Sequence, residues 1–88
     1  SPVEGYEELT REDAMLEALM LGLRMVGDGL KGGQFMERFG LSPIEAFTGW
    51  DTLFSDGLVE ARGLDLILTR KGLLFLNEIL LKLTPKGA

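Results

Sequence analysis

The stretch DGLVEARGLDLILTRKG, residues 56–72, constrains the fold of this chain more than any other. It opens with Asp56 and Gly57, a pair that typically ends a helix and begins a turn. Two short apolar runs follow, residues 58–59 and 64–68, and between them Gly63 can supply the positive φ of a tight hairpin. Thr69 then caps a new helix. A helix, a small hairpin and another helix are typical of the end of a winged-helix domain.

A first helix is predicted to begin after Thr10 and to end near Met25. Thr10 can accept a hydrogen bond from the first turn, and Glu12 and Asp13 suit the positive end of the helix dipole. Residues spaced three and four apart form one broad apolar face, which is expected to pack in the core. This face comprises Met15, Leu19, Gly22, Leu23 and Val26, with Leu16 at its rim.

A second apolar line follows the same helix, beyond a polar strip formed by Asp13, Glu17 and Arg24. An ordinary surface helix has no such second line, and exposed apolar surface commonly marks a docking site. The last helix carries a similar pair off its core face. The candidate docking interface is therefore Ala14, Ala18, Leu21, Met25, Leu74 and Leu81. The alternative is that residues 1–9 or the short second helix cover these side chains within the domain.

The middle of the chain predicts a connection and two helices. Glycine-dense residues 26–33 form a sharp connection with Leu30 directed inward, and residues 34–39 form a short helix that Gly40 ends. SPIE at 42–45 is a capping box with proline at the first helical position, and its helix is expected to continue to about Ser55. The expected core residues of this third helix are Ile44, Phe47, Leu53 and Phe54, and Trp50 is expected at the edge, where its N–H can reach a partner.

The last helix is predicted over residues 70–83, with Leu73, Leu76, Ile79, Leu80 and Leu83 in the core. The fold class is therefore α+β and mainly α: a winged-helix-like bundle of about four helices with a two-stranded β-hairpin wing. The expected organisation is a linker over residues 1–9, the winged-helix domain over 10–84 and a tail over 85–88.

Composition excludes several kinds of site. The chain has no cysteine and no histidine, so it offers no thiolate for zinc or an iron–sulfur cluster and no imidazole base. Ser42 and Ser55 have a capping or turn role and no such base to activate them. We therefore expect no catalytic residue, no cofactor-binding residue and no metal site in this chain, and no enzymatic activity from the chain alone.

The charge pattern argues against nucleic-acid binding. The net charge is −5, and residues 43–55, which would be the recognition helix of a winged helix, contain Glu45 and Asp51 but no Lys or Arg. A free-standing winged-helix DNA-binding regulator is therefore only the alternative. No apolar run is long enough to span a membrane and no signal peptide is visible, so we expect a cytoplasmic protein without a membrane or nucleic-acid partner.

Three motifs, in order, resemble the C-terminal domain of the oxygen-independent coproporphyrinogen III oxidase (HemN) family and its heme-chaperone (HemW) relatives. The first is Glu17 with LGLR at 21–24 and Gly29-Leu30; the second is the short helix with Phe35, Phe39 and Gly40. The third is DGL at 56–58 with LILTRKG at 66–72, and Asn77 follows. The similarity covers about residues 10–83. LGLR…GL together with DGL…LT-x-KG is fairly specific, whereas the second pattern alone occurs in many winged-helix proteins.

The resemblance implies a parent protein with an upstream radical S-adenosylmethionine barrel that binds a [4Fe–4S] cluster and S-adenosylmethionine. The oxidases of the family decarboxylate coproporphyrinogen III, and the chaperones bind and transfer heme. The resemblance further implies that this domain is a non-catalytic accessory domain that packs on the barrel of the same polypeptide and helps to cover it. Arg24 matches the family block, where it is either a substrate contact or a structural arginine.

Overall fold

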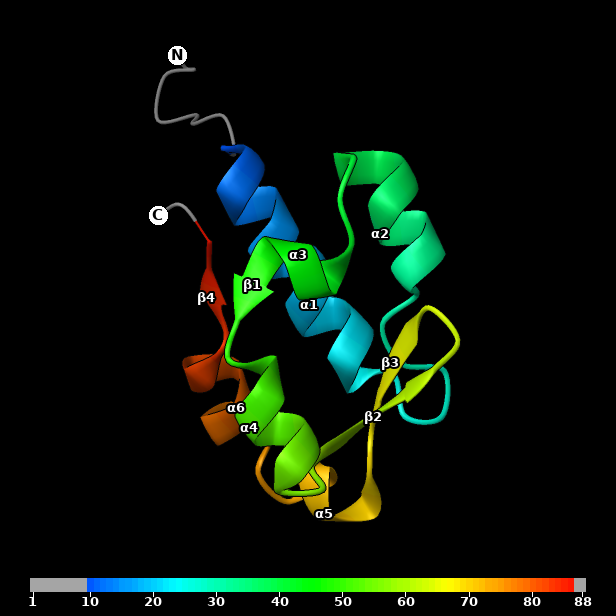
Figure 1. The fold of residues 1–88 in the computed structure, drawn as a ribbon, viewed down its shortest axis with the longest axis vertical. Helices are drawn as coiled ribbons and strands as arrows, with labels where there is room; N and C mark the ends of the chain where they lie inside the picture. The colour runs from blue at the N-terminus through cyan, green and yellow to red at the C-terminus, as the bar shows by residue number, and fades with distance from the viewer. Residues whose placement is uncertain (1–9, 87–88) are drawn as a thin grey trace, which may run out of the picture.

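The computed structural model describes residues 10–86, and it confirms an α+β fold that is mainly helical (Figure 1). Its two antiparallel two-stranded sheets are the expected hairpin and a second, unexpected pair. In chain order, the elements are α1 Arg11–Arg24, α2 Gly32–Phe39, α3 Pro43–Ala46, β1 Phe47–Thr48, α4 Trp50–Ser55, β2 Val59–Arg62, β3 Asp65–Leu68, α5 Arg70–Leu73, α6 Leu76–Lys82 and β4 Thr84–Pro85. The expected linker lies outside the described residues.

Helix α1 begins and ends where its sequence predicts. The Thr10 side chain accepts a hydrogen bond from the Asp13 N–H at 3.0 Å, and the chain becomes extended at Met25. Met15, Leu19 and Leu23 are buried, as expected for the core face. The assignment of Val26 to this face was wrong: the helix ends before it, and its side chain is 70% exposed.

The connection after α1 crosses the helix at Gly22. A Cβ atom at Gly22 would lie 2.9 Å from the Cα of Leu30, so glycine lets the two backbones meet. Leu30 is buried as predicted, and it exchanges two backbone hydrogen bonds with Leu66, at 2.8 and 3.0 Å. The connection therefore joins α1 to the hairpin.

The prediction of a single helix over residues 43–55 was wrong. The capping box forms as predicted, since Ser42 and Glu45 exchange backbone-to-side-chain hydrogen bonds of 2.8 and 3.1 Å, but α3 ends after one turn. Strand β1 follows and pairs with β4, and Gly49, with φ at 112°, turns the chain into α4. Pairing with a segment 36 residues away overrides the local helical pattern.

The split helix changes two side-chain assignments. Ile44 was expected in the core but is 42% exposed, because α3 is too short to continue the face on which it was placed. Trp50 was expected at the edge but is buried, 3% exposed, although its N–H finds the expected kind of partner, the carbonyl oxygen of Pro43 at 3.0 Å. Phe47 and Leu53 are buried as predicted, and Phe54 packs against the core while half-buried.

The hairpin forms as predicted. Strands β2 and β3 pair antiparallel, with Val59 opposite Leu68 and Arg62 opposite Asp65. Gly63 begins the two-residue turn with φ at 61°, a conformation that favours glycine. Thr69 then caps α5 by accepting from the Gly72 N–H at 3.0 Å.

The last helix is divided, which also departs from the prediction. Helices α5 and α6 are separated at Phe75, whose backbone is not helical, and Leu73 is 41% exposed rather than buried. Ile79 and Leu83 are buried as expected, whereas Leu76 and Leu80 are half-buried. Beyond Leu83, the Lys86 N–H donates a hydrogen bond to the carbonyl oxygen of Ala46 at 2.9 Å.

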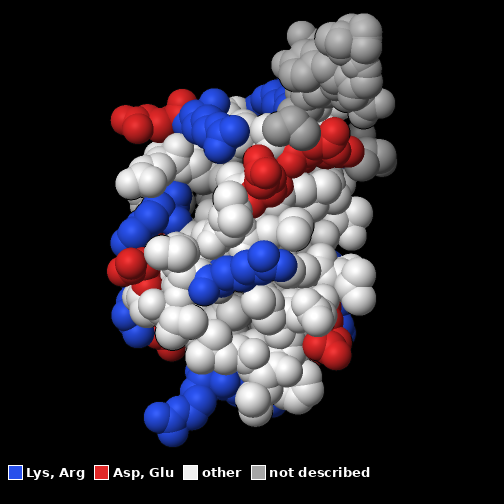
Figure 2. All heavy atoms as spheres, turned by 180° about the vertical axis from the view of Figure 1, so that it is seen from behind, with Lys and Arg blue, Asp and Glu red and all other residues white. Residues whose placement is uncertain are grey.

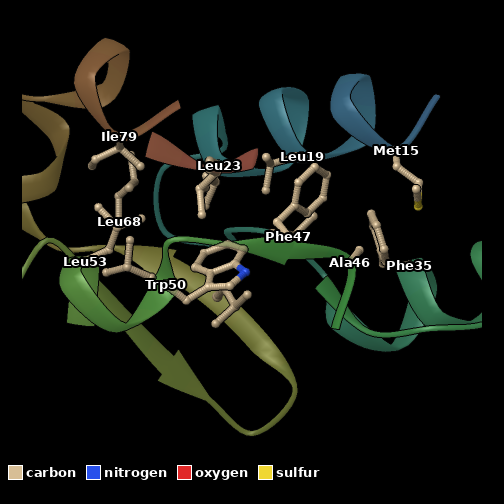
Figure 3. Packing of buried hydrophobic residues seen from close by; sticks show 14 of the residues in the cluster. Met15, Leu19, Leu23, Phe35, Ala46, Phe47, Trp50, Leu53, Leu68 and Ile79 are labelled. Atoms are coloured by element: carbon tan, nitrogen blue, oxygen red, sulfur yellow. The ribbon is translucent and has the colours of Figure 1, made fainter. Parts of the chain in front are cut away.

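In the core, the buried side of α1 packs against side chains of β1, α4 and α6 (Figure 3). Figure 3 shows side chains of α1 meeting Phe47 and Trp50 from one side and Ile79 from α6 beside them. Phe47, Leu19, Leu23, Leu53 and Ile79 are almost completely removed from solvent. Within residues 10–86 no charged side chain is buried, so every charge of the described domain lies at its surface.

Candidate docking groove

Helices α1 and α2 line an open groove of about 510 Å³, which we call the α1–α2 groove. Apolar atoms dominate its lining. The apolar residues are Ala18, Leu21 and Gly22 from α1, Met25, Gly29 and Leu30 from the connection that follows it, and Phe35 and Phe39 from α2. The Phe35 and Phe39 rings, one helical turn apart, have centroids 4.7 Å apart.

Three of the six predicted docking residues meet in this groove: Ala18, Leu21 and Met25. Leu21 is 58% and Met25 56% exposed, which leaves apolar side chains of α1 open to a partner. Ala14 does not line the groove and is half-buried against the core instead. The alternative, that the short second helix covers these side chains, holds only in part: α2 forms the other wall of the groove, but Leu21 and Met25 stay more than half exposed.

The α2 residues that line the groove were not predicted, because Phe35 and Phe39 were interpreted only as a pair within one helix. Their i, i+4 spacing indicates that they share a face, but it does not show which element that face meets. In the structure this face packs toward β1, with the Phe35 and Phe47 ring centroids 6.4 Å apart. The Arg11 guanidinium also donates to the backbone carbonyl oxygen of Phe39, which ties the end of α2 to the start of α1.

Within the described part of the chain, the charged side chains that line the groove are both cations, Lys31 and Arg38, although the net charge is −5. Lys31 is already engaged, since its ammonium lies 3.4 Å from a carboxylate oxygen of Asp65. The Arg38 guanidinium carbon lies 4.7 Å from the centroid of the Phe39 ring, a cation–π arrangement. The groove is therefore apolar with a positive rim.

The other two predicted docking residues lie elsewhere. Leu74, at the end of α5, is 78% exposed, and Leu81 of α6 is 83% exposed; neither lines the α1–α2 groove. Figure 2 shows the face opposite to that of Figure 1, where uncharged side chains cover the centre, one basic side chain crosses them and most other charges lie toward the margins. The domain thus presents more apolar surface than the groove alone.

Arg24 lies outside the groove, exposed in the last turn of α1. A cation at this end of a helix is stabilised by the helix dipole. Of the two structural roles expected for Arg24, burial is therefore wrong and a capping role at the end of α1 fits its position, while its contact with a substrate stays a prediction.

Most cations near the hairpin already contact a carboxylate or carbonyl oxygen of the domain itself. Arg62 pairs with Glu60 at 3.0 Å, and the Lys71 ammonium donates to the carbonyl oxygen of Asp56 at 3.0 Å. The segment expected to be a recognition helix is interrupted by β1 and keeps Glu45 and Asp51 exposed. This arrangement leaves few free cations for contacts with DNA phosphates.

Residues 10–86 contain neither a membrane-spanning helix nor a metal-binding cluster. No helix there has the length and apolar character needed to cross a membrane. The same residues hold no cluster of three or more Asp, Glu, His or Cys side chains arranged to bind a metal ion.

Comparison with known proteins gives one match. A family model described as the HemN C-terminal domain matches residues 9–88, nearly the whole chain. No curated protein and no solved structure gives a significant match.

Proposed function

Because the chain belongs to the HemN C-terminal domain family, we propose that it docks on, and helps to cover, the upstream barrel of a radical S-adenosylmethionine protein in tetrapyrrole metabolism. Family membership makes it an accessory domain of a HemN-like protein. The parent activity, as an oxidase of coproporphyrinogen III or as a heme chaperone, resides in the barrel. The domain itself contributes surface rather than chemistry.

The observation that carries this proposal is the apolar surface left open by the folded domain. Leu21, Met25, Leu74 and Leu81 are each more than half exposed, although the core is filled by other side chains. Leaving such side chains in water forgoes about 1.5–3 kcal/mol each relative to full burial. Docking on a larger domain would recover part of that free energy.

The parent's cofactors do not fit this chain. A cluster of the expected kind is held by thiolates, and the chain has no cysteine and no histidine. The [4Fe–4S] cluster and S-adenosylmethionine would therefore be bound by the upstream barrel, and no chemical step is assigned to residues of this domain.

Association of separated parts tests the proposal. The 88-residue chain and the preceding part of its parent polypeptide are produced separately, and their binding is measured by titration calorimetry. The double variant Leu21→Gln/Leu81→Gln should weaken binding at least about tenfold, since both apolar contacts are lost at the interface. Ile44→Gln is the control: its side chain is 42% exposed and lies outside the groove.

The control and the double variant should both remain folded, because all three altered side chains are exposed in the free domain. If the double variant binds as tightly as the unaltered chain, or if the two parts do not associate at all, docking through this surface is excluded. A natural gene product no larger than the 9.7 kDa chain would contradict the proposal that this domain is part of a longer polypeptide.

A further inference from the structure

The shape of the α1–α2 groove favours a protein segment as its occupant. Pockets for small molecules typically enclose 70–90% of the ligand surface. This groove is instead bounded by Leu21 and Met25, which are themselves 58% and 56% exposed, so it covers its occupant from one side only. A segment whose opposite side is covered by its own domain fits such an open trough. The flexible thioether of Met25 also suits contact with an irregular apolar surface.

The charge of the groove indicates what that segment carries. Among residues 10–86, no Asp or Glu lines the groove, and the two charged residues that do are cations. Asp65 already engages Lys31, whereas within residues 10–86 no carboxylate lies at ion-pair distance from Arg38. Stacking on Phe39 holds the Arg38 guanidinium at the rim, where its planar group can bind a carboxylate through two parallel hydrogen bonds.

We propose that the α1–α2 groove accepts an apolar segment of the upstream barrel, and that a carboxylate on this segment pairs with Arg38. The inference rests on the proposed docking function and names the chemistry of the partner. The apolar side chains of the segment lie against Leu21, Met25 and Phe35. Gln34, exposed at the rim, offers its side-chain amide to the backbone of the segment.

Cross-linking in the intact parent polypeptide identifies the segment. Met25 is replaced by a benzophenone-bearing phenylalanine, the protein is irradiated, and the cross-linked peptide is sequenced by mass spectrometry. We expect a peptide from the barrel with apolar residues and an Asp or Glu within one helical turn of the cross-link. A cross-linked peptide without a carboxylate would contradict the inference.

Charge reversal tests the pairing with the separated parts. Arg38→Glu should weaken their association about tenfold, because a carboxylate left opposite a like charge in an interface is unfavourable. Replacing the identified acid by Arg in the barrel should restore binding to Arg38→Glu. Arg62→Glu is the matched control, since Arg62 is exposed, lies on the hairpin and does not line the groove.

The two proposals fail in different ways. If the unaltered parts associate but Arg38→Glu binds as well as Arg62→Glu does, the carboxylate pairing is wrong and docking stands. If the unaltered parts do not associate, the docking function fails first. Circular dichroism of Arg38→Glu checks that the variant keeps the helical content of the unaltered chain.

Discussion

Gly32 and Gly33 are neighbours at the start of α2, yet a side chain at each would meet different surroundings. A Cβ at Gly32 would overlap the carbonyl oxygen of Leu64, whereas at Gly33 the nearest atom is the Leu64 Cδ1 at 4.0 Å. Gly32→Ala should lower the free energy of unfolding by about 1–3 kcal/mol, because a backbone must move. Gly33→Ala should leave it unchanged or raise it by up to about 1 kcal/mol, since alanine favours a helix.

Urea denaturation of the two variants measures this difference. Both substitutions add one methyl group to the first turn of the same helix, so each is the control for the other. Equal stability of the two variants would contradict the close approach of α2 to the hairpin turn.

Gly49 permits the break between β1 and α4 that the sequence did not reveal. Its φ is 112°, and a Cβ would also overlap the carbonyl oxygen of Lys82. Gly49→Ala should therefore lower the free energy of unfolding by about 2–5 kcal/mol, from backbone strain and overlap together. Gly57 has a similar φ of 73° but open space around it, so Gly57→Ala should cost only about 1–2 kcal/mol.

Chemical denaturation of these two variants separates overlap from backbone strain. If Gly49→Ala is no less stable than Gly57→Ala, the close approach of the C-terminal end of α6 to Gly49 is wrong.

At the scale of elements, local capping signals predicted three of the six helix starts in the described residues, those of α1, α3 and α5, and missed contacts between distant segments. The caps at Thr10, Ser42 and Thr69 could be read from the sequence because each satisfies backbone groups within three residues. Strand β1 could not, because its partner β4 lies 36 residues away and Thr84-Pro85 is equally typical of a chain leaving a domain. Once β1 is a strand, Ile44 no longer belongs to a core face.

As with the elements, the part of the groove that depends on one helix could be predicted from the sequence, and the part that depends on distant contacts could not. The recurrence of Ala18, Leu21 and Met25 showed that α1 has a second apolar side. That α2 lies along this side depends on Leu30 joining the hairpin and on Gly32 packing against Leu64, contacts that helical periodicity does not encode. The positive rim likewise emerges only when residues 31 and 38 are placed beside α1.

The two sides of α1 should respond differently to substitution. Leu19 is 1% exposed, and Leu19→Ala should lower the free energy of unfolding by about 2–5 kcal/mol through the cavity it leaves. Leu21 is 58% exposed, and Leu21→Ala should change that free energy by only about 0.5 kcal/mol. Thermal or urea unfolding of the free chain checks both. A large loss of stability in Leu21→Ala would assign Leu21 to the core and remove it from the docking surface.

At the scale of the whole molecule, charge bears on the alternative of a DNA-binding regulator. The chain has a net charge of −5, and the segment in the position of a recognition helix carries no cation. We expect no binding of duplex DNA at micromolar protein in about 50 mM salt, measured by fluorescence anisotropy, since even non-specific binding depends on phosphate contacts by Lys and Arg. Binding that weakens steeply as salt is added would instead support the regulator.

Docking on the upstream barrel requires that the α1–α2 groove be covered in the parent protein. A Met25→Cys variant is prepared both as the free chain, which has no other cysteine, and within the parent polypeptide, and the rate of thiol labelling at this site is followed by peptide mass spectrometry. Ile44→Cys serves as the exposed control outside the groove. Labelling at position 25 should slow at least about tenfold in the parent, as expected for a site at the centre of an interface, while labelling at position 44 keeps its rate. Equal labelling of position 25 in the free chain and in the parent would contradict docking through the α1–α2 groove.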